Sequence, residues 1–316
     1  MKTLFTITVL LIASHLSAQF QWEMANDKIT EGLHDIEFFN DSIGIVYSYG
    51  TGNIYRTTDE GLHWEIVTQT DSIFFEQIQI FKTTTWVCGE YGRILKSKDY
   101  GITWEDISIE SENNLLLYGL YFRGLMVGYV SGAEIIDRKF IPKTYLTYDG
   151  GITWHEKLTD FPFMILNLCR KGDFLFASGS GRISKFRMMK HETRHAFQDT
   201  LRIIKQIRDL KFADDRFGIA CSFNGYILTT NDGGDSFRPK RITTNRLRSI
   251  AYLGDKKWIA AGDNNSTGNA VLYFSNNNGD TWHKNNDFPD IHRIHLTEKH
   301  IWIVGKKGLI AKTPRP

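Results

Sequence analysis

Short apolar stretches separated by glycine-containing turns recur along this chain. In the first well-defined segment the stretches cover residues 35–39, 43–48, 54–57 and 64–67. Apolar and polar residues alternate within them, and turn residues such as Asn40 and Asp41 lie between them, which predicts β-strands. Four short strands within roughly 42 residues are typical of one antiparallel propeller blade.

A second pattern, Ser/Thr-x-Asp-x-Gly-x-Thr-Trp, recurs at the end of these segments. A carboxylate there can accept hydrogen bonds from nearby backbone N–H groups. The glycine permits a positive φ, and the aromatic residue opens the next strand and buries a large ring. Five equivalent copies cannot share one active site, so we interpret them as structural turns and not as catalytic or calcium-binding groups. Their Asp, Gly and aromatic positions are Asp59, Gly61, Trp64; Asp99, Gly101, Trp104; Asp149, Gly151, Trp154; Asp232, Gly234, Phe237; and Asn277, Gly279, Trp282.

The spacing of the motif gives the number of blades. Trp154 and Phe237 are 83 residues apart, nearly two repeats, and a degenerate unit without the Asp turn fills the interval around 174–190. We expect the seven first strands to start near Asp35, Gln77, Gly119, Asn167, Asp209, Ser249 and Arg293.

The last unit, from Arg293, contains only three strands, at 294–296, 301–304 and 309–312. The segment 20–24 can supply the fourth. We therefore predict an all-β fold, a seven-bladed β-propeller spanning residues 19–316, closed by N- and C-terminal strands in one blade. Closure in this way removes the exposed edges of an open sheet.

The N-terminus has the pattern of a secretory signal peptide. Lys2 is followed by an apolar run over 4–16 and by the small residues Ser17 and Ala18. We predict removal of residues 1–18 and an exported chain that is periplasmic or secreted. The alternative, a membrane anchor, is disfavoured because the run is shorter than the ~20 apolar residues of a spanning helix. No later segment approaches a membrane span.

The cysteines indicate neither metal binding nor a disulfide framework. Cys88, Cys169 and Cys221 are an odd number, and each lies in an apolar, strand-like run. We expect all three to be small buried hydrophobic residues. No spacing of His, Cys or acidic residues suggests a metal, and no motif suggests a cofactor.

Charge is distributed unevenly although the net charge is only +2. Residues 19–116 contain 6 Lys/Arg and 17 Asp/Glu, whereas residues 182–257 contain 17 Lys/Arg and 8 Asp/Glu. Such asymmetry can mark a partner surface, although a purely solvated surface can also show it. The basic half lacks the aromatic-interleaved pattern of a nucleic-acid module, and export also argues against nucleic acid.

The repeated motif resembles the Asp box, or BNR repeat, of sialidases, sortilin-type receptors, xyloglucanases and photosystem II assembly-factor-like propellers. Segments 89–104 and 223–234 are most similar to the last group. The resemblance covers nearly all of residues 33–316 and implies the propeller fold. Function follows sites and not folds, so it does not by itself imply a photosystem role.

Resemblance to sialidases implies an arginine that binds the acid sugar, upstream of the first motif in a Phe/Tyr-Arg-Ile-Pro segment. In this chain Arg56 is the only arginine before Thr57, and it belongs to the strand of the motif itself. The segment Phe140-Ile141-Pro142 lacks the arginine between Phe and Ile. Xyloglucanases use two propellers, and this chain has the length for one. We therefore expect no enzymatic activity, with a sialidase-like or glucanase-like glycosidase, or a glycan-binding protein, as the alternative.

In the family geometry, one face of the ring carries the residues that precede the first strands and the loops between second and third strands. This face is our candidate binding site for another protein of the cell envelope, acidic where it contacts the arginines. The arginines come from consecutive blades and can form one solvent-exposed basic arc; ordinary solvated residues are the alternative. The candidate residues are Arg182, Arg208, Arg248, His292, Arg93, Tyr91, His34 and Tyr118.

Overall fold

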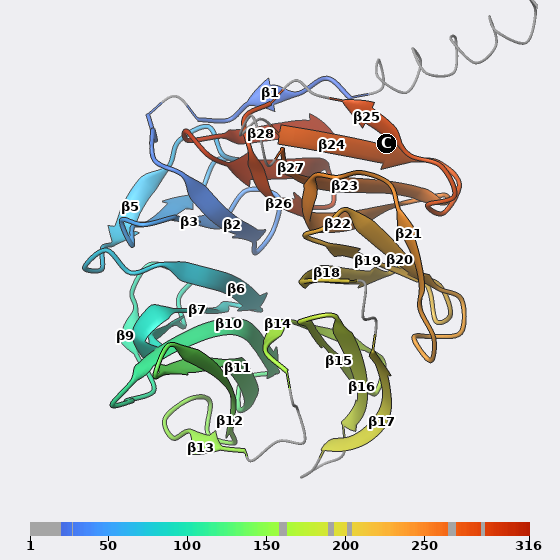
Figure 1. The fold of residues 1–316 in the computed structure, drawn as a ribbon. Helices are drawn as coiled ribbons and strands as arrows, with labels where there is room; N and C mark the ends of the chain where they lie inside the picture. Colours follow the sequence, from blue (N-terminus) through green and yellow to red (C-terminus); the bar gives the residue numbers. More distant parts are fainter. Residues whose placement is uncertain are drawn as a thin grey trace, which may run out of the picture.

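The computed structural model is a ring of seven four-stranded antiparallel sheets, as predicted (Figure 1). It describes residues 20–26, 28–157, 163–188, 193–200, 204–264, 270–285 and 288–316. Strands pair in sequence order within blades one to six. The first three blades comprise β2 (Leu33–Phe38), β3 (Gly44–Ser48), β4 (Ile54–Thr57) and β5 (Glu65–Thr68); β6 (Phe75–Phe81), β7 (Thr84–Gly89), β8 (Ile94–Ser97) and β9 (Glu105–Asp106); and β10 (Asn114–Arg123), β11 (Val127–Ile136), β12 (Lys139–Thr147) and β13 (His155–Glu156). The next three comprise β14 (Ile165–Lys171), β15 (Phe174–Gly179), β16 (Arg182–Met188) and β17 (Thr193–Thr200); β18 (Ile207–Phe212), β19 (Gly218–Ser222), β20 (Tyr226–Thr230) and β21 (Arg238–Arg241); and β22 (Arg246–Gly254), β23 (Lys257–Asp263), β24 (Ala270–Ser275) and β25 (His283–Asn285).

The seventh blade joins the two ends of the chain. It contains β26 (Ile291–Leu296), β27 (His300–Gly305), β28 (Ile310–Pro314) and, as its outer strand, β1 (Glu23–Met24). Glu23 pairs with Lys312 and Met24 with Ala311. The predicted closure is confirmed, although the N-terminal strand is shorter than the segment 20–24. The predicted signal peptide lies outside the described residues.

The fourth blade has four strands although it lacks the turn motif, as the degenerate repeat predicted. Its replacement turn, residues 189–192, lies outside the described residues. In the part of the chain that the structure describes there is one short 3₁₀ segment, η1 (Glu90–Gly92). Among the described residues no helix has the length and apolar character needed to cross a membrane.

Apolar clusters between neighbouring blades form the core. One cluster joins Trp86 and Cys88 of blade two to Leu117 and Phe122 of blade three. Trp86, Trp258 and Trp302, all on second strands, are fully buried. The expectation that the motif tryptophans bury their rings was too strong: they are only partly buried, because each lies at the end of its blade.

The three cysteines are unpaired thiols. Cys88 and Cys221 are buried, as expected for small apolar residues. Cys169 is only partly buried, which differs from our expectation. It lies toward the end of β14, next to the exposed Arg170, where burial along the strand decreases.

The five motif turns share one hydrogen-bond pattern. In the second blade Gly101 N donates to Ser97 Oγ (2.9 Å), and Thr103 N donates to Asp99 Oδ1 (2.9 Å). The glycine has a φ of +78°, and a Cβ there would lie 2.3 Å from Ile45 Cδ1 of the preceding blade. The turn therefore closes its own blade and packs against the previous one.

Replacing the Asp of the motif should destabilise the fold without affecting the binding of a ligand. We expect Asp99→Ala to cost about 1–3 kcal/mol of unfolding free energy, because the N–H of Thr103 loses its acceptor. Asp99→Asn is the control: Asn277 of the fifth motif accepts the same bond from Thr281 N (2.9 Å) through an amide oxygen. Urea unfolding measures both, and an equal loss in the two variants would contradict the turn interpretation.

Candidate functional site

The first strand of each blade is its inner strand. In all seven blades the pairing of the inner strand with the second strand has a break in register at the same place. The breaks lie between Leu33 and Asp35, Phe75 and Gln77, Leu117 and Gly119, Ile165 and Asn167, Ile207 and Asp209, Leu247 and Ser249, and Ile291 and Arg293. A β-bulge of this kind leaves one residue unpaired and redirects its side chain. The seven bulge residues are His34, Glu76, Tyr118, Leu166, Arg208, Arg248 and His292, and all of them line one pocket at the channel mouth.

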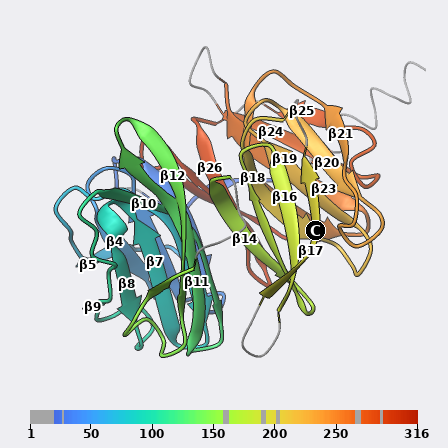
Figure 2. The same cartoon turned by 60° about the horizontal axis from the view of Figure 1, so that its bottom comes forward.

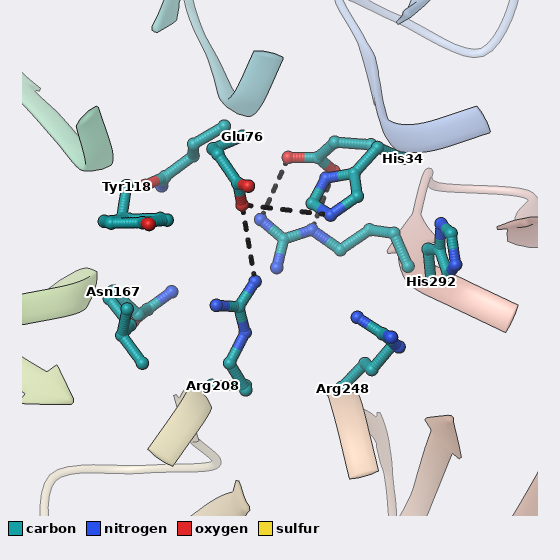
Figure 3. Close-up of a pocket in the computed structure, with 11 residues that line it drawn as sticks. His34, Glu76, Tyr118, Asn167, Arg208, Arg248 and His292 are labelled. Carbon is teal, nitrogen blue, oxygen red and sulfur yellow. Dashed lines mark hydrogen bonds and ion pairs between the residues drawn. The ribbon is translucent and has the colours of Figure 1, made fainter. Parts of the chain in front are cut away.

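This finding corrects the predicted strand starts. We expected the bulge residues to precede the first strands, but they lie inside them, and β10 begins as early as Asn114. The ring of side chains itself is as expected. Figure 3 shows the side chains arranged around a common space, with strands from different blades contributing one each.

Glu76 joins opposite sides of the mouth. Its Oε2 lies 3.5 Å from Arg208 Nη2 and 3.9 Å from His34 Nε2 (Figure 3). Arg208 comes from blade five and Glu76 from blade two. The mouth is therefore not purely basic, and a ligand for Arg208 must compete with an internal carboxylate.

Both histidines at the mouth are neutral near pH 7. Burial lowers the pKa of His34 well below its ordinary value, and His292 and the nearby arginines lower it further. Burial, with Arg248, lowers the pKa of His292 to about 3. The two rings are 5.3 Å apart, and His292 Nδ1 lies 2.9 Å from the backbone oxygen of Leu33. They contribute hydrogen bonding and shape to the mouth, and the arginines supply the positive charge.

The arginines that lie together in the structure are not the same three as in the predicted basic arc. Arg208, Arg246 and Arg248 lie around the ring of Phe223, at 4.9, 5.7 and 5.0 Å from its centroid. We call these three arginines and Phe223 the arginine cluster; Arg208 and Arg248 line the mouth pocket, whereas Arg246 and Phe223 lie beside it. Asp263 pairs with Arg248 (2.5 Å) and more distantly with Arg246 (4.0 Å).

Three predicted site residues lie elsewhere. Arg182 begins β16, lies 5.7 Å from the centroid of Phe163, and is not among the residues lining the mouth. Tyr91 and Arg93 line a separate groove between blades two and three, where Arg93 pairs with Asp106. Loops between second and third strands lie further from the axis than the bulges, so their side chains do not reach the pocket.

The prediction that the arginines of the arc are exposed to solvent was also wrong. The side chains of Arg208 and Arg248 are only 15% and 17% exposed, whereas that of Arg246 is 48% exposed. Sequence reasoning missed Arg246 and Phe223. The spacing of Arg246 two residues before Arg248, on one face of an alternating strand, was the available signal.

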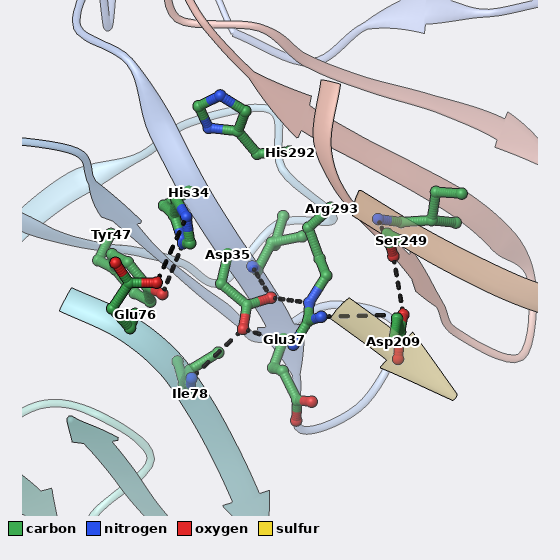
Figure 4. A network of polar contacts seen from close by, with 12 residues as sticks. His34, Asp35, Glu37, Tyr47, Glu76, Ile78, Asp209, Ser249, His292 and Arg293 are labelled. Atoms are coloured by element: carbon green, nitrogen blue, oxygen red, sulfur yellow. Dashed lines mark hydrogen bonds and ion pairs between the residues drawn. The ribbon is translucent and has the colours of Figure 1, made fainter. Parts of the chain in front are cut away.

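Below the mouth, Arg293 forms a buried ionic cluster (Figure 4). Its Nε and Nη2 lie 2.7 and 3.0 Å from the two oxygens of Asp35, and its Nη1 lies 3.8 Å from Asp209 Oδ2. Burial disfavours the Arg293 cation, but the two carboxylates outweigh it and raise the pKa. Arg293 lines both the mouth pocket and a second pocket beside Glu37 and Lys211, so this cluster separates the two.

The residues after the bulges link neighbouring blades. Asp35, Gln77, Asp209 and Ser249 each accept a hydrogen bond from a backbone N–H of the next inner strand. Arg293 completes the series by donating to Asp35. Blades three and four interrupt it, because Gly119 has no side chain and Asn167 Oδ1 is buried without a partner. Asn167 is also one of the residues that line the mouth.

Glu37, in the second pocket, should make stability depend on pH. Burial and the nearby Asp35 raise its pKa to about 7, from an ordinary 4.5. Between these values the unfolded chain has released a proton that the folded chain retains, so stability falls as pH rises. We expect Glu37→Gln to raise the melting temperature at pH 8 and to change it little at pH 4. A variant that melts below the wild type at pH 8 would contradict the raised pKa.

The mouth combines guanidinium, imidazole and carboxylate groups. Guanidinium groups can hold carboxylates through two parallel hydrogen bonds. Among the described residues no three His, Cys, Asp or Glu side chains are grouped to hold a metal. The site and fold together define a propeller with a polar mouth above an ionic cluster.

The family follows from comparison with known proteins. A family model described as "Photosynthesis system II assembly factor YCF48" matches residues 14–195, more than half of the chain. The chain belongs to this family. Its members are assembly factors and not enzymes, so the expectation of a non-catalytic propeller is confirmed and the glycosidase alternative is set aside.

Individual relatives are distant. The chain is 23% identical over 290 residues to the photosystem II assembly lipoprotein Ycf48 of Synechococcus sp. (strain CC9902), covering 87% of this chain and 82% of that protein. A structure titled "YCF48 bound to D1 peptide" has a TM-score of 0.72 at 17% identity, covering 94% of this chain and 97% of that one. Ycf48 from Cyanidioschyzon merolae has a TM-score of 0.68 at 17% identity, covering 93% and 98%. Because the identity is low, the similarity to these two structures shows a shared fold and nothing more.

Proposed function

We propose that this protein is an exported assembly factor that holds an acidic segment of another cell-envelope protein at its channel mouth. The arginine cluster is the observation that carries this proposal. Three guanidinium groups meet around one aromatic ring, with Asp263 and Glu76 as their carboxylate partners among the described residues. An additional carboxylate can pair with Arg246, the most exposed of the three.

Two further observations support a protein partner. The family consists of assembly factors, and one structurally similar relative carries a bound peptide according to its title. The signal-peptide pattern supports export, as does the relative that is a lipoprotein by name. The first cysteine of this chain is Cys88, within a blade, so no cysteine follows the predicted cleavage site closely.

We expect Arg208→Gln combined with Arg246→Gln to abolish capture of the partner from the native cell envelope. Wild-type binding should also weaken with added salt, because the contact is between charges. Glutamine is preferred to glutamate here, since a glutamate would repel Glu76 and Asp263 and disturb the fold. Pull-down followed by mass spectrometry at low and high salt measures both effects.

The matched control removes two arginines from another place. Arg238 and Arg241 lie on the exposed outer strand β21 of blade five, so Arg238→Gln with Arg241→Gln lowers the net charge equally. The control should retain the partner. Equal capture by the mouth variant and the wild type, at both salt concentrations, would refute the proposed site.

A further inference from the structure

The outer strands of the blades differ in charge. Blades two and three expose Glu105, Asp106 and Glu156 there, and each of these carboxylates pairs with a lysine or arginine of its own blade. The outer strand of blade five, β21, reads Arg-Pro-Lys-Arg, and all four residues are exposed. On the outer strand of blade six, β25, Lys284 is exposed. We call Arg238, Lys240, Arg241 and Lys284 the basic rim.

The basic rim lies on both sides of the joint between blades five and six. Lys240 Nζ donates to the backbone oxygen of Asp280, in the motif turn of blade six (2.5 Å). Lys284 is opposite Tyr273 in the strand register, so the two side chains share a face. This face is turned toward blade five, because the Tyr273 hydroxyl donates to Thr243 Oγ1 (2.8 Å). Figure 2 shows β21 and β25 together on the side of the molecule away from blades one to three.

The cations of the basic rim are not neutralised by the described part of the chain. None of the four forms an ion pair with a described carboxylate, and two of them donate to backbone oxygens, which leaves their charge unpaired. The motif turns of blades five and six contain three aspartates. Asp232 accepts hydrogen bonds from its own turn, and Asp235 pairs with Lys185 of blade four (2.8 Å). Of these three, the exposed Asp280 is left to offset the four cations, so the joint has an excess of positive charge.

The basic rim offers charge without an apolar anchor. Among the described residues, every exposed large apolar side chain lies in blades one to three, apart from Met24 of the seventh blade. Pro239 has no N–H, which limits the hydrogen bonds that the short strand β21 can offer to an added strand. Exposed cations spread over two blades suit a partner whose negative charge is also spread over a surface, as it is in anionic lipid headgroups.

We propose that the basic rim rests on an anionic lipid surface. In a ring of seven blades, blade two lies opposite the joint between blades five and six. Residues 19–116, with 6 Lys/Arg and 17 Asp/Glu, are repelled by such a surface, so charge also orients the ring. Because the outer strands form the perimeter and the mouth lies at the end of the channel axis, the mouth opens along the lipid surface. This contact uses no residue of the mouth and is therefore independent of the proposed function.

Vesicle flotation with the full chain tests the contact. At low salt we expect the chain to bind phosphatidylcholine vesicles that contain about 30% phosphatidylglycerol, and to bind pure phosphatidylcholine vesicles at least about tenfold more weakly. Added salt should release the chain from the anionic vesicles, because it screens the charges. Every variant has the same N-terminus as the wild type, and the phosphatidylcholine vesicles measure any lipid binding by that segment.

The rim variant, Arg238→Gln with Lys284→Gln, should weaken binding to the anionic vesicles about tenfold or more. Neither side chain forms a hydrogen bond or ion pair with the described residues, so the melting temperature should stay unchanged. The matched control, Lys82→Gln with Lys139→Gln, removes two exposed cations from blades two and three and should bind as the wild type does. The mouth variant, Arg208→Gln with Arg246→Gln, should also bind the vesicles as the wild type does.

Three results would overturn the lipid contact. Equal binding of both kinds of vesicle, or an equal loss in the rim variant and its matched control, would show that the basic rim is not the contact. Loss of vesicle binding from the mouth variant alone would assign the lipid to the arginine cluster. Soluble polyglutamate that binds more tightly than the anionic vesicles and is lost from the rim variant would assign the rim to an acidic protein segment. None of these results alters the expected capture of the partner by the mouth, which is measured separately.

Discussion

Replacing Arg293 with methionine should destabilise this propeller by about 3–5 kcal/mol, since removing one partner leaves a buried carboxylate uncompensated. Arg293 makes a two-pronged contact with Asp35 and also approaches Asp209, and both carboxylates are almost completely buried. These partners come from the first and fifth blades, so the loss should weaken the ring and not one sheet. Urea unfolding followed by tryptophan fluorescence measures the effect.

Two further variants identify the cause of this loss. Arg293→Lys keeps the charge but loses the planar guanidinium group, so its unfolding free energy should lie between those of Arg293→Met and the wild type. Asp35→Asn combined with Arg293→Met should be less destabilised than Arg293→Met alone, because the uncompensated charge at Asp35 is gone. A single methionine variant within about 1 kcal/mol of the wild type would show that the cluster does not contribute as a buried ion pair.

The repeated turn motif was sufficient to predict the number of blades and their closure. A motif that fixes one turn per blade also fixes the spacing of the strands around it, so even the fourth blade could be located by its interval. The terminal strands could be paired because β26 to β28 left one position open. These are local patterns, and local patterns are what a sequence displays directly.

The channel mouth could be predicted only in part. His34, Tyr118, Arg208, Arg248 and His292 were identified because they occupy one repeat position. Their bulged geometry could not be predicted, because a bulge is a property of backbone pairing and no single residue type specifies it. The burial of Arg208 depends on Glu76 across the ring, and this contact joins residues 132 positions apart in the chain.

Arg293 shows which signal was overlooked. It occupies the repeat position that Asp35 and Asp209 occupy in other blades, and it is the one basic residue among the seven. Opposite charges at equivalent positions of a closed ring point toward the same axis. An ion pair across the channel could therefore have been predicted once the closure had been predicted.

Replacing Trp302 with alanine is the second change for which we expect a large effect, a loss of about 3–5 kcal/mol. The side chain is fully buried and stacks on Phe38 at 4.5 Å. A Cβ on Gly61 would lie 2.7 Å from its ring, so the motif turn of blade one also packs against it. Trp302 thus fills the joint between the seventh and the first blade.

The matched control for this joint is Trp86→Ala. Trp86 is equally buried and stacks on Phe122 at 4.1 Å, but it joins blades two and three, which are continuous in sequence. Both variants should lose similar unfolding free energy in urea. Only Trp302→Ala should also increase proteolysis near β1 and β28, because β1 is held to the other three strands of the seventh blade by its pairing with β28, whereas the strands of blades two and three follow one another along the chain. Equal protection of these two strands in both variants would show that the closing joint is no weaker than the others.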